Sequence, residues 1–431
     1  MNDKQLTKAL DTALKDGLFE RDDLYLFDTN LAWQLSNEAH VRDPQRMAFF
    51  AALEAHPDVA GLLGKHLNSG LNAPQFTAQT LGDWLLTRAS KNGAEPTITE
   101  LRAFIDCPRA NVEEHLAFSG LEVNQLITLS PGVELIPISS LPESALTISL
   151  VDPEWFYFGR DARGYVRRKT VQVLAAFGKS AWHSNPHVAT AMLRVHHKVE
   201  PKMVATPIEL PNSIEALVES LLVMAAATET AMFPVAHWMS STPETPMWGH
   251  FSWLRWSHLN ALRPFARAAE QGERIVAAVH AWKRFPNNLK KKLRVPLERL
   301  NRALAATSSI DCAIDIGVAL EALLLGDLEP NDQISLAFRL RGAWLLGENP
   351  AERREYVKQF NAIYTCRSVA VHTGSLPTKG VIIDSTKVAE HEFIMNRARH
   401  LTATSILKVI HGSAIPEWSS LILGVHDLSG G

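Results

Sequence analysis

Apolar residues recur at helical spacing over most of the chain, and the pattern is strongest in its C-terminal part. Ile316, Leu320, Leu323 and Leu324 follow an i, i+4, i+7, i+8 repeat, which predicts a helix with one buried face. Similar repeats predict successive helices at 288–306, 309–325, 333–346, 351–372 and 385–411. Because the connecting segments are short, neighbouring helices should be antiparallel, and we expect a helical bundle in this region.

The first 125 residues also have a helical pattern. Helices are predicted at 5–16, 44–67, 80–89 and 97–105. Thr97 or Thr99 would cap the last of them, and a second short helix is predicted at 111–118. Two interpretations stay open. A small helical domain is favoured because two helices joined by a turn are common, and a winged helix-turn-helix would also use the apolar runs at 120–129 and 133–138.

The periodicity changes between residues 126 and 255. Short β-branched segments at 133–138 and 145–151, continued by 155–158, predict strands, whereas 215–230 predicts a core helix. We therefore predict a mainly α protein with a middle mixed α+β region. The predicted domains are a helical one at 1–125, the mixed region at 126–255 and the helical bundle at 256–431.

A tryptophan-rich stretch follows the predicted core helix. It holds Trp238, Trp248, Trp253 and Trp256, interleaved with His250, Arg255 and His258. Such aromatic residues can stack on nucleic-acid bases, although packing at a domain interface is the more common use and is favoured here.

Composition restricts the possible functions. The chain has 431 residues and a formal net charge of -3, so any contact with a nucleic acid must be local. Cys107, Cys312 and Cys366 are far apart and odd in number, which favours reduced thiols over a disulfide framework. No run approaches the ~18 apolar residues of a membrane span, and the N-terminus has no apolar signal segment. We expect a soluble, cytoplasmic protein.

An arginine and a histidine near the end of an otherwise apolar helix are the main candidates for chemistry. Arg367 can bind a phosphate as a permanent cation, and His372 can transfer protons near neutral pH. Their five-residue spacing turns the two side chains about 140° apart on a straight helix. Action on one phosphate therefore requires that the last turn loosens, or that a second copy of the chain contributes.

Three segments carry a resemblance to a known family. They are Asp311 with Ala319-Leu320-Glu321-Ala322-Leu323-Leu324, the stretch 339–346, and Ile363-Tyr364-Thr365-Cys366-Arg367-Ser368-Val369-Ala370-Val371-His372-Thr373-Gly374. Together they make residues 290–425 similar to the HEPN superfamily, and to its ApeA-like branch. An arginine, a polar residue, variable positions and a histidine form the family motif, and Arg367, Ser368 and His372 fill these places. The resemblance covers about a third of the chain.

Many HEPN domains are metal-independent endoribonucleases that act as dimers. The resemblance implies that Arg367 and His372 are catalytic, that RNA is the substrate, and that no cofactor or metal is needed. It also implies a homodimer and a toxin-like role in defence against phage, with a phage-derived or nucleic-acid trigger sensed by the N-terminal region. Ser368, Glu321 and Asp315 would support the two catalytic side chains.

Two basic clusters are candidates for RNA contacts. They are Lys290, Lys291 and Lys292, and the denser group with Arg167, Arg168 and Lys169 next to Arg160 and Arg163. A solvated helix face is the more common use of such runs. His196 and His197 lack cysteine or carboxylate partners at ligand spacing, so no metal site is predicted.

Two other functions remain open from the sequence. The bundle could be a non-catalytic HEPN module that binds RNA or a partner protein, with Arg367 paired to Glu321 or Asp315 and His372 at a helix end. Alternatively, residues 1–150 could bind DNA through a winged helix and make the protein a regulator.

Overall fold

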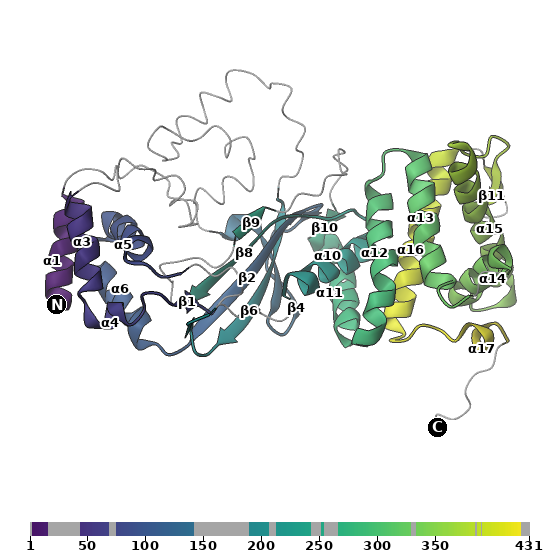
Figure 1. Ribbon diagram of the computed structural model, residues 1–431. Coiled ribbons are helices and arrows are strands. Elements are labelled where there is room, and N and C mark those ends of the chain that lie inside the picture. The colour runs from purple at the N-terminus through teal and green to yellow at the C-terminus, as the bar shows by residue number, and fades with distance from the viewer. Residues whose placement is uncertain are drawn as a thin grey trace, which may run out of the picture. The chain divides into compact units, whose positions relative to one another are not determined.

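A computed structural model describes the chain (Figure 1). The described residues are 2–15, 44–68, 75–141, 189–206, 213–242, 251–253, 266–328, 333–383, 386–388 and 390–423. The protein is mainly helical, with a sheet in its middle part. It divides into two compact units: residues 1–119, 123–215 and 234–256 form the first, and residues 120–122, 216–233 and 257–431 form the second. The predicted split of 1–255 into two domains stays a prediction.

Among the described residues, five helices form the N-terminal part of the first unit. They are α1 (Asp3–Leu14), α3 (Pro44–Glu54), α4 (Pro57–Ala60), α5 (Ala78–Asn92) and α6 (Ala94–Asp106). Their apolar faces share one core around the fully buried Leu10, Phe49 and Phe104. The prediction of a single helix at 44–67 was wrong. Pro57 lies at the first position of α4, where it begins a new helix because it has no backbone N–H to continue the previous one.

Helix α6 begins at Ala94 after Gly93, earlier than predicted. Neither Thr97 nor Thr99 caps it. Both lie inside the helix, where the Thr97 hydroxyl donates to the carbonyl of Gly93 at 2.8 Å and the Thr99 hydroxyl to that of Glu95 at 3.0 Å. The expected cap was therefore wrong.

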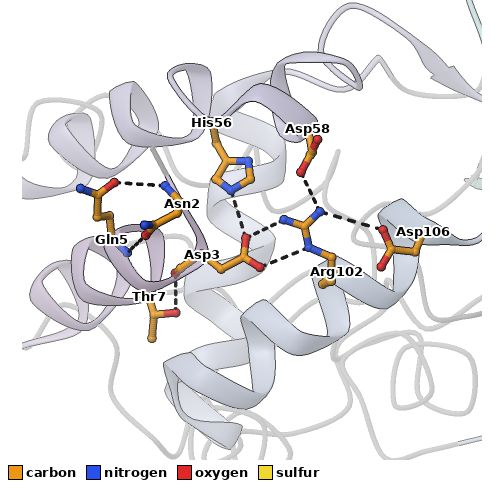
Figure 2. Close-up of polar contacts among 8 residues, drawn as sticks. All are labelled: Asn2, Asp3, Gln5, Thr7, His56, Asp58, Arg102 and Asp106. Atoms are coloured by element: carbon orange, nitrogen blue, oxygen red, sulfur yellow. Dashed lines mark hydrogen bonds and ion pairs between the residues drawn. The ribbon is translucent and has the colours of Figure 1, made fainter.

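Arg102 joins three helices of this region through its guanidinium (Figure 2). It donates to Asp3 of α1 at 2.7 and 3.2 Å and to Asp58 of α4 at 2.7 Å. His56, which is buried, lies 3.0 Å from the same Asp3 carboxylate. The hydrogen bond from Arg102 is the main reason that the pKa of Asp3 lies below its usual value.

A six-stranded sheet follows, with the strand order β4-β5-β6-β2-β8-β9. Its strands are β2 (Ala110–Ser119), β4 (Ile127–Ser130), β5 (Val133–Pro137), β6 (Ala191–Val199), β8 (Phe233–Thr242) and β9 (Phe251–Trp253). Strand β2 is central and pairs antiparallel with β6 from Ala110 to Phe118. Strand β5 agrees with the predicted strand at 133–138.

The predicted helix at 111–118 was wrong, because this segment is strand β2. Most of its residues are buried, on both faces, so the strand has no clean alternation of apolar and polar positions. A winged helix-turn-helix needs a second helix here, and the structure has a strand instead. The winged helix-turn-helix built from 97–105 and 111–118 is therefore wrong, and DNA binding by residues 1–150 stays a prediction.

Helices dominate the second unit. They are α10 (Ser213–Thr228), α11 (Ala268–Arg284), α12 (Asn287–Ala305), α13 (Ser309–Leu324), α14 (Ile334–Leu346), α15 (Pro350–Thr373), α16 (His391–His411) and α17 (Trp418–Leu423). Figure 1 shows α12, α13 and α16 side by side, and α13 also packs on α15. The predicted helices at 288–306, 309–325, 333–346 and 351–372 match α12 to α15 within one residue at each end.

The prediction of a helix from residue 385 was wrong at its start. Strands β11 (Val381–Ile383) and β12 (Thr386–Val388) form a short hairpin, and α16 begins at His391. Two further short pairs are β1 (His66–Leu67) with β7 (Met203–Val204), and β3 (Leu121–Glu122) with β10 (Ala266–Arg267). Among the described residues, no helix is long and apolar enough to cross a membrane.

Several predicted features lie outside the described residues. They are the strands at 145–151 and 155–158, Trp248, Trp256, His250, Arg255, His258, and the cluster of Arg160, Arg163, Arg167, Arg168 and Lys169. Trp238 is described and is fully buried in β8, where it stacks on the His115 ring with 4.9 Å between the centroids. This tryptophan is a core residue and offers no surface to a base.

Candidate functional site

Arg367 lies on the C-terminal half of α15, at the contact with α13. Its Nη2 donates to Glu321 Oε2 of α13 at 2.8 Å. The two side chains are 25% and 24% exposed, so the ion pair is only partly shielded from water. Arg367 Nε is buried and has no hydrogen-bond partner among the described residues. The guanidinium is thus held from one side.

His372 lies on the last turn of α15 and is exposed. The α-helix continues through Thr373 and ends at Gly374, whose φ of 63° is left-handed and whose N–H donates to the carbonyl of Ala370 at 3.0 Å. The last turn is therefore regular, and it does not loosen to bring His372 round to Arg367. Within one chain, the two side chains leave the helix about 140° apart.

The remaining predicted support residues have different positions. Ser368 follows Arg367 on α15 and is half-buried. Asp315 is buried on α13, where its carboxylate pairs with Arg299 at 2.8 Å and Arg302 at 3.5 Å, both on α12. In the structure, Glu321 therefore pairs with Arg367, whereas Asp315 pairs with arginines of α12. The predicted role of Asp315 in supporting Arg367 or His372 is therefore not reflected in its ion pairs, which are with Arg299 and Arg302.

The lysine run lies in the first two turns of α12. Lys290 Nζ is 5.4 Å from the centroid of the buried Trp282 ring, and Lys291 and Lys292 are exposed. Burial, and then the like charge of Lys290, lower the pKa of the nearby Lys283. This corner between α11 and α12 is locally cationic, although the chain as a whole is slightly acidic.

Sequence reasoning missed a set of histidine–glutamate pairs on the sheet. Glu114, at the centre of β2, is 1% exposed and accepts from His197 Nε2 at 2.9 Å and from His237 Nε2 at 2.7 Å. On the opposite face, His196 lies 3.1 Å from Glu134. His196 and His197 therefore do have carboxylate partners, one on each face, which come from other strands.

The same opposite face carries further polar contacts. Arg194 pairs with Glu134 at 2.6 Å, and His115 lies 3.5 Å from Glu113. Burial lowers the pKa of His115, and the hydrogen bond from His115 is the main reason that the pKa of Glu113 is lowered. The two successive histidines, His196 and His197, were the available signal in the sequence. Within the described ranges, no group of three or more histidine, cysteine, aspartate or glutamate residues is arranged to hold a metal ion.

No protein-family model matches the chain, and no curated protein or solved structure shows a significant similarity to it.

Proposed function

We propose that the protein is a metal-independent endoribonuclease of the HEPN type, with Arg367 and His372 as catalytic residues. One observation carries the proposal. Arg367 is tied to Glu321 at the contact between α13 and α15, while the exposed His372 lies on the last turn of the same helix. An arginine fixed in this way is positioned to bind a phosphate as a permanent cation.

The chemistry needs a cation and a proton carrier. The ribose 2′-hydroxyl attacks the adjacent phosphorus, the bond from phosphorus to the 5′ oxygen breaks, and the products are a 2′,3′-cyclic phosphate and a 5′-hydroxyl. His372 takes the proton from the 2′-hydroxyl or gives one to the leaving oxygen. Arg367 stabilises the charge that develops on the phosphoryl oxygens. Glu321 keeps the guanidinium in place.

A homodimer is part of the proposal, because the regular last turn of α15 keeps Arg367 and His372 apart in one chain. A second copy supplies the missing partner if the two copies meet near this end of α15. Exposed apolar side chains support such a contact. Val371 on α15, Ile382 on β11 and Phe393 on α16 are 48%, 51% and 47% exposed, and β11 packs on α15.

The rest of the chain would sense the trigger. We propose that the region before the bundle restrains or releases the nuclease in the cytoplasm, in a defence response to phage, as the family resemblance implies. Lys290, Lys291 and Lys292 are candidates for guiding the RNA backbone.

Full-length protein incubated with structured RNA in the presence of EDTA tests the activity. We expect cleavage that leaves cyclic phosphate and 5′-hydroxyl ends, and no cleavage at a 2′-deoxy linkage. Arg367→Ala and His372→Ala should each reduce the rate about 10²-fold or more. Two matched controls should keep full activity: Arg354→Ala, an exposed arginine of α15, and His411→Ala, an exposed histidine on the last turn of α16.

Cleavage that survives both substitutions would refute the assignment. RNA that is bound but never cut, with binding lost in Arg367→Ala, would instead favour the non-catalytic module.

Mixing the two inactive variants tests the shared site. A heterodimer of Arg367→Ala and His372→Ala chains holds one composite site with both residues intact, so activity should partly return on mixing. If each chain contained its own complete site, mixing would restore nothing.

A further inference from the structure

Gly317 lies in the middle of α13, between Ile316 and Val318, and it is buried. A glycine inside a helix reduces helix stability relative to alanine. Its backbone is helical, and it is not among the residues with positive φ, so conformational freedom does not explain it. The reason for the glycine must therefore be space.

The space is taken by the stem of Arg367. A Cβ atom on Gly317 would lie 2.1 Å from Arg367 Cγ, 2.9 Å from its Cβ and 3.2 Å from its Cδ. The arginine stem thus lies directly on the backbone of α13. Glu321 is four residues further along, so it lies on the same face of α13, where it accepts from the end of that side chain.

Gly342 of α14 shows what a purely structural contact of this kind looks like. A Cβ there would lie 2.5 Å from Cε1 of Phe360, a fully buried ring of α15. The notch left by the missing side chain of Gly342 thus receives a core side chain. The notch at Gly317 receives a charged side chain that is 25% exposed.

We propose that Gly317 is a positioning residue for the reaction: its missing side chain lets the Arg367 stem cross α13, which fixes the guanidinium beside Glu321 for the phosphate. The inference rests on the proposed function. With any side chain at position 317 the stem must leave the notch, and the guanidinium that it carries is displaced from its position beside Glu321. A misplacement of about 1 Å at a catalytic group can cost about 10²-fold in rate.

Gly317→Ala in the full-length protein is the test. The rate constant for RNA cleavage should fall about 10²-fold, towards that of Arg367→Ala. Affinity for the uncleavable 2′-deoxy RNA should stay within about twofold, because Arg367 acts mainly on charge that forms in the transition state. Val318→Ala perturbs the same turn of α13 without filling the notch and should keep the wild-type rate.

A second readout does not depend on catalysis. In an Arg367→Ala background the notch is empty, so Gly317→Ala should raise the Tm by about 2–4 °C through helix propensity alone. In the wild-type background the clash should cancel or reverse this gain. If Gly317→Ala alone folds poorly and the added Arg367→Ala substitution restores folding, the same coupling is present in a stronger form.

The outcomes separate the two proposals. Wild-type cleavage lost in Arg367→Ala but retained in Gly317→Ala would overturn the role of Gly317 and leave the nuclease assignment intact. Equal Tm changes in both backgrounds would also overturn it. A wild-type protein that never cleaves RNA would refute the nuclease and with it the catalytic role of Gly317, while the Tm cycle would still decide whether Gly317 fixes Arg367.

Discussion

Replacing Glu321 by alanine removes the carboxylate that holds Arg367. Fully exposed ion pairs contribute about 0.2–1 kcal/mol, whereas breaking a buried pair costs about 3–5 kcal/mol. The Arg367–Glu321 pair lies between these limits, because both side chains are about one-quarter exposed and the two atoms are 2.8 Å apart. Arg367 Nε also has no other described partner to compensate. We expect Glu321→Ala to cost about 1–2 kcal/mol.

A double-mutant cycle with Arg367→Ala isolates this contribution. Urea unfolding of the full-length protein gives the free energy of unfolding for the wild type, both single variants and the double variant. The coupling energy should be about 1 kcal/mol. Glu321→Gln keeps an oxygen acceptor of the same shape, so its cost should be smaller than that of Glu321→Ala. Both variants should also cleave RNA more slowly, because the guanidinium is no longer restrained.

A coupling energy below about 0.3 kcal/mol would refute the reasoning, since independent sites already deviate from additivity by this amount. The Arg367–Glu321 pair would then make no measurable contribution to the free energy of unfolding. Unchanged cleavage in Glu321→Ala would separately show that the restraint is not needed for catalysis.

Two further predictions concern other parts of the chain. Arg102→Gln should lower the free energy of unfolding by about 1 kcal/mol at pH 7. The pKa of Asp3 is lowered in the folded state, so this contribution is complete above a pH of about 3.8, the ordinary pKa of the group, and disappears as the pH falls through the folded pKa. The urea midpoints of the variant and the wild type should therefore converge in acid. Burial raises the pKa of Cys366 to about 11, so iodoacetamide at pH 8 should leave it unlabelled in the folded protein and label it in urea. Rapid labelling of native Cys366 would contradict its burial.

The bundle helices were predictable because their signals are local. Ser308 and Asn349 cap α13 and α15 by accepting backbone N–H groups, and Gly374 ends α15 in a left-handed conformation. Each of these residues acts within a few positions of the helix end it defines. The apolar repeat between the caps predicted the helices themselves.

Strand β2 was not predictable by the same means. Glu114 is polar and nearly inaccessible, and it is stabilised by His197 and His237, which are 83 and 123 residues away. No local pattern identifies such partners, so the segment was taken for an amphipathic helix. Its burial on both faces is a property of the assembled sheet.

The candidate site contains residues that local signals predicted and residues that they did not. The motif selected Arg367 and His372 as candidates, which stay a prediction. Glu321 was expected to hold one of them and pairs with Arg367, whereas Asp315 was expected to do the same and instead pairs with α12. Gly317 was missed entirely. A glycine within an apolar helix was the available signal, yet only the structure reveals which side chain fills the space.

The second unit is assembled from separate stretches of the chain, and this affects how the unit that holds the candidate site could be isolated. Residues 216–233 belong to it together with 257–431. Asn301 of α12, 1% exposed, donates to the carbonyl of Met232 and accepts from its N–H, each at 2.9 Å, while His400 of α16 and Arg274 of α11 both bind Glu229. A fragment beginning near residue 257 would keep every candidate catalytic residue and still lose a helix of its own core, leaving the Asn301 amide without these partners. The second unit is thus not a detachable C-terminal module, and expression of residues 257–431 alone would yield an incomplete fold.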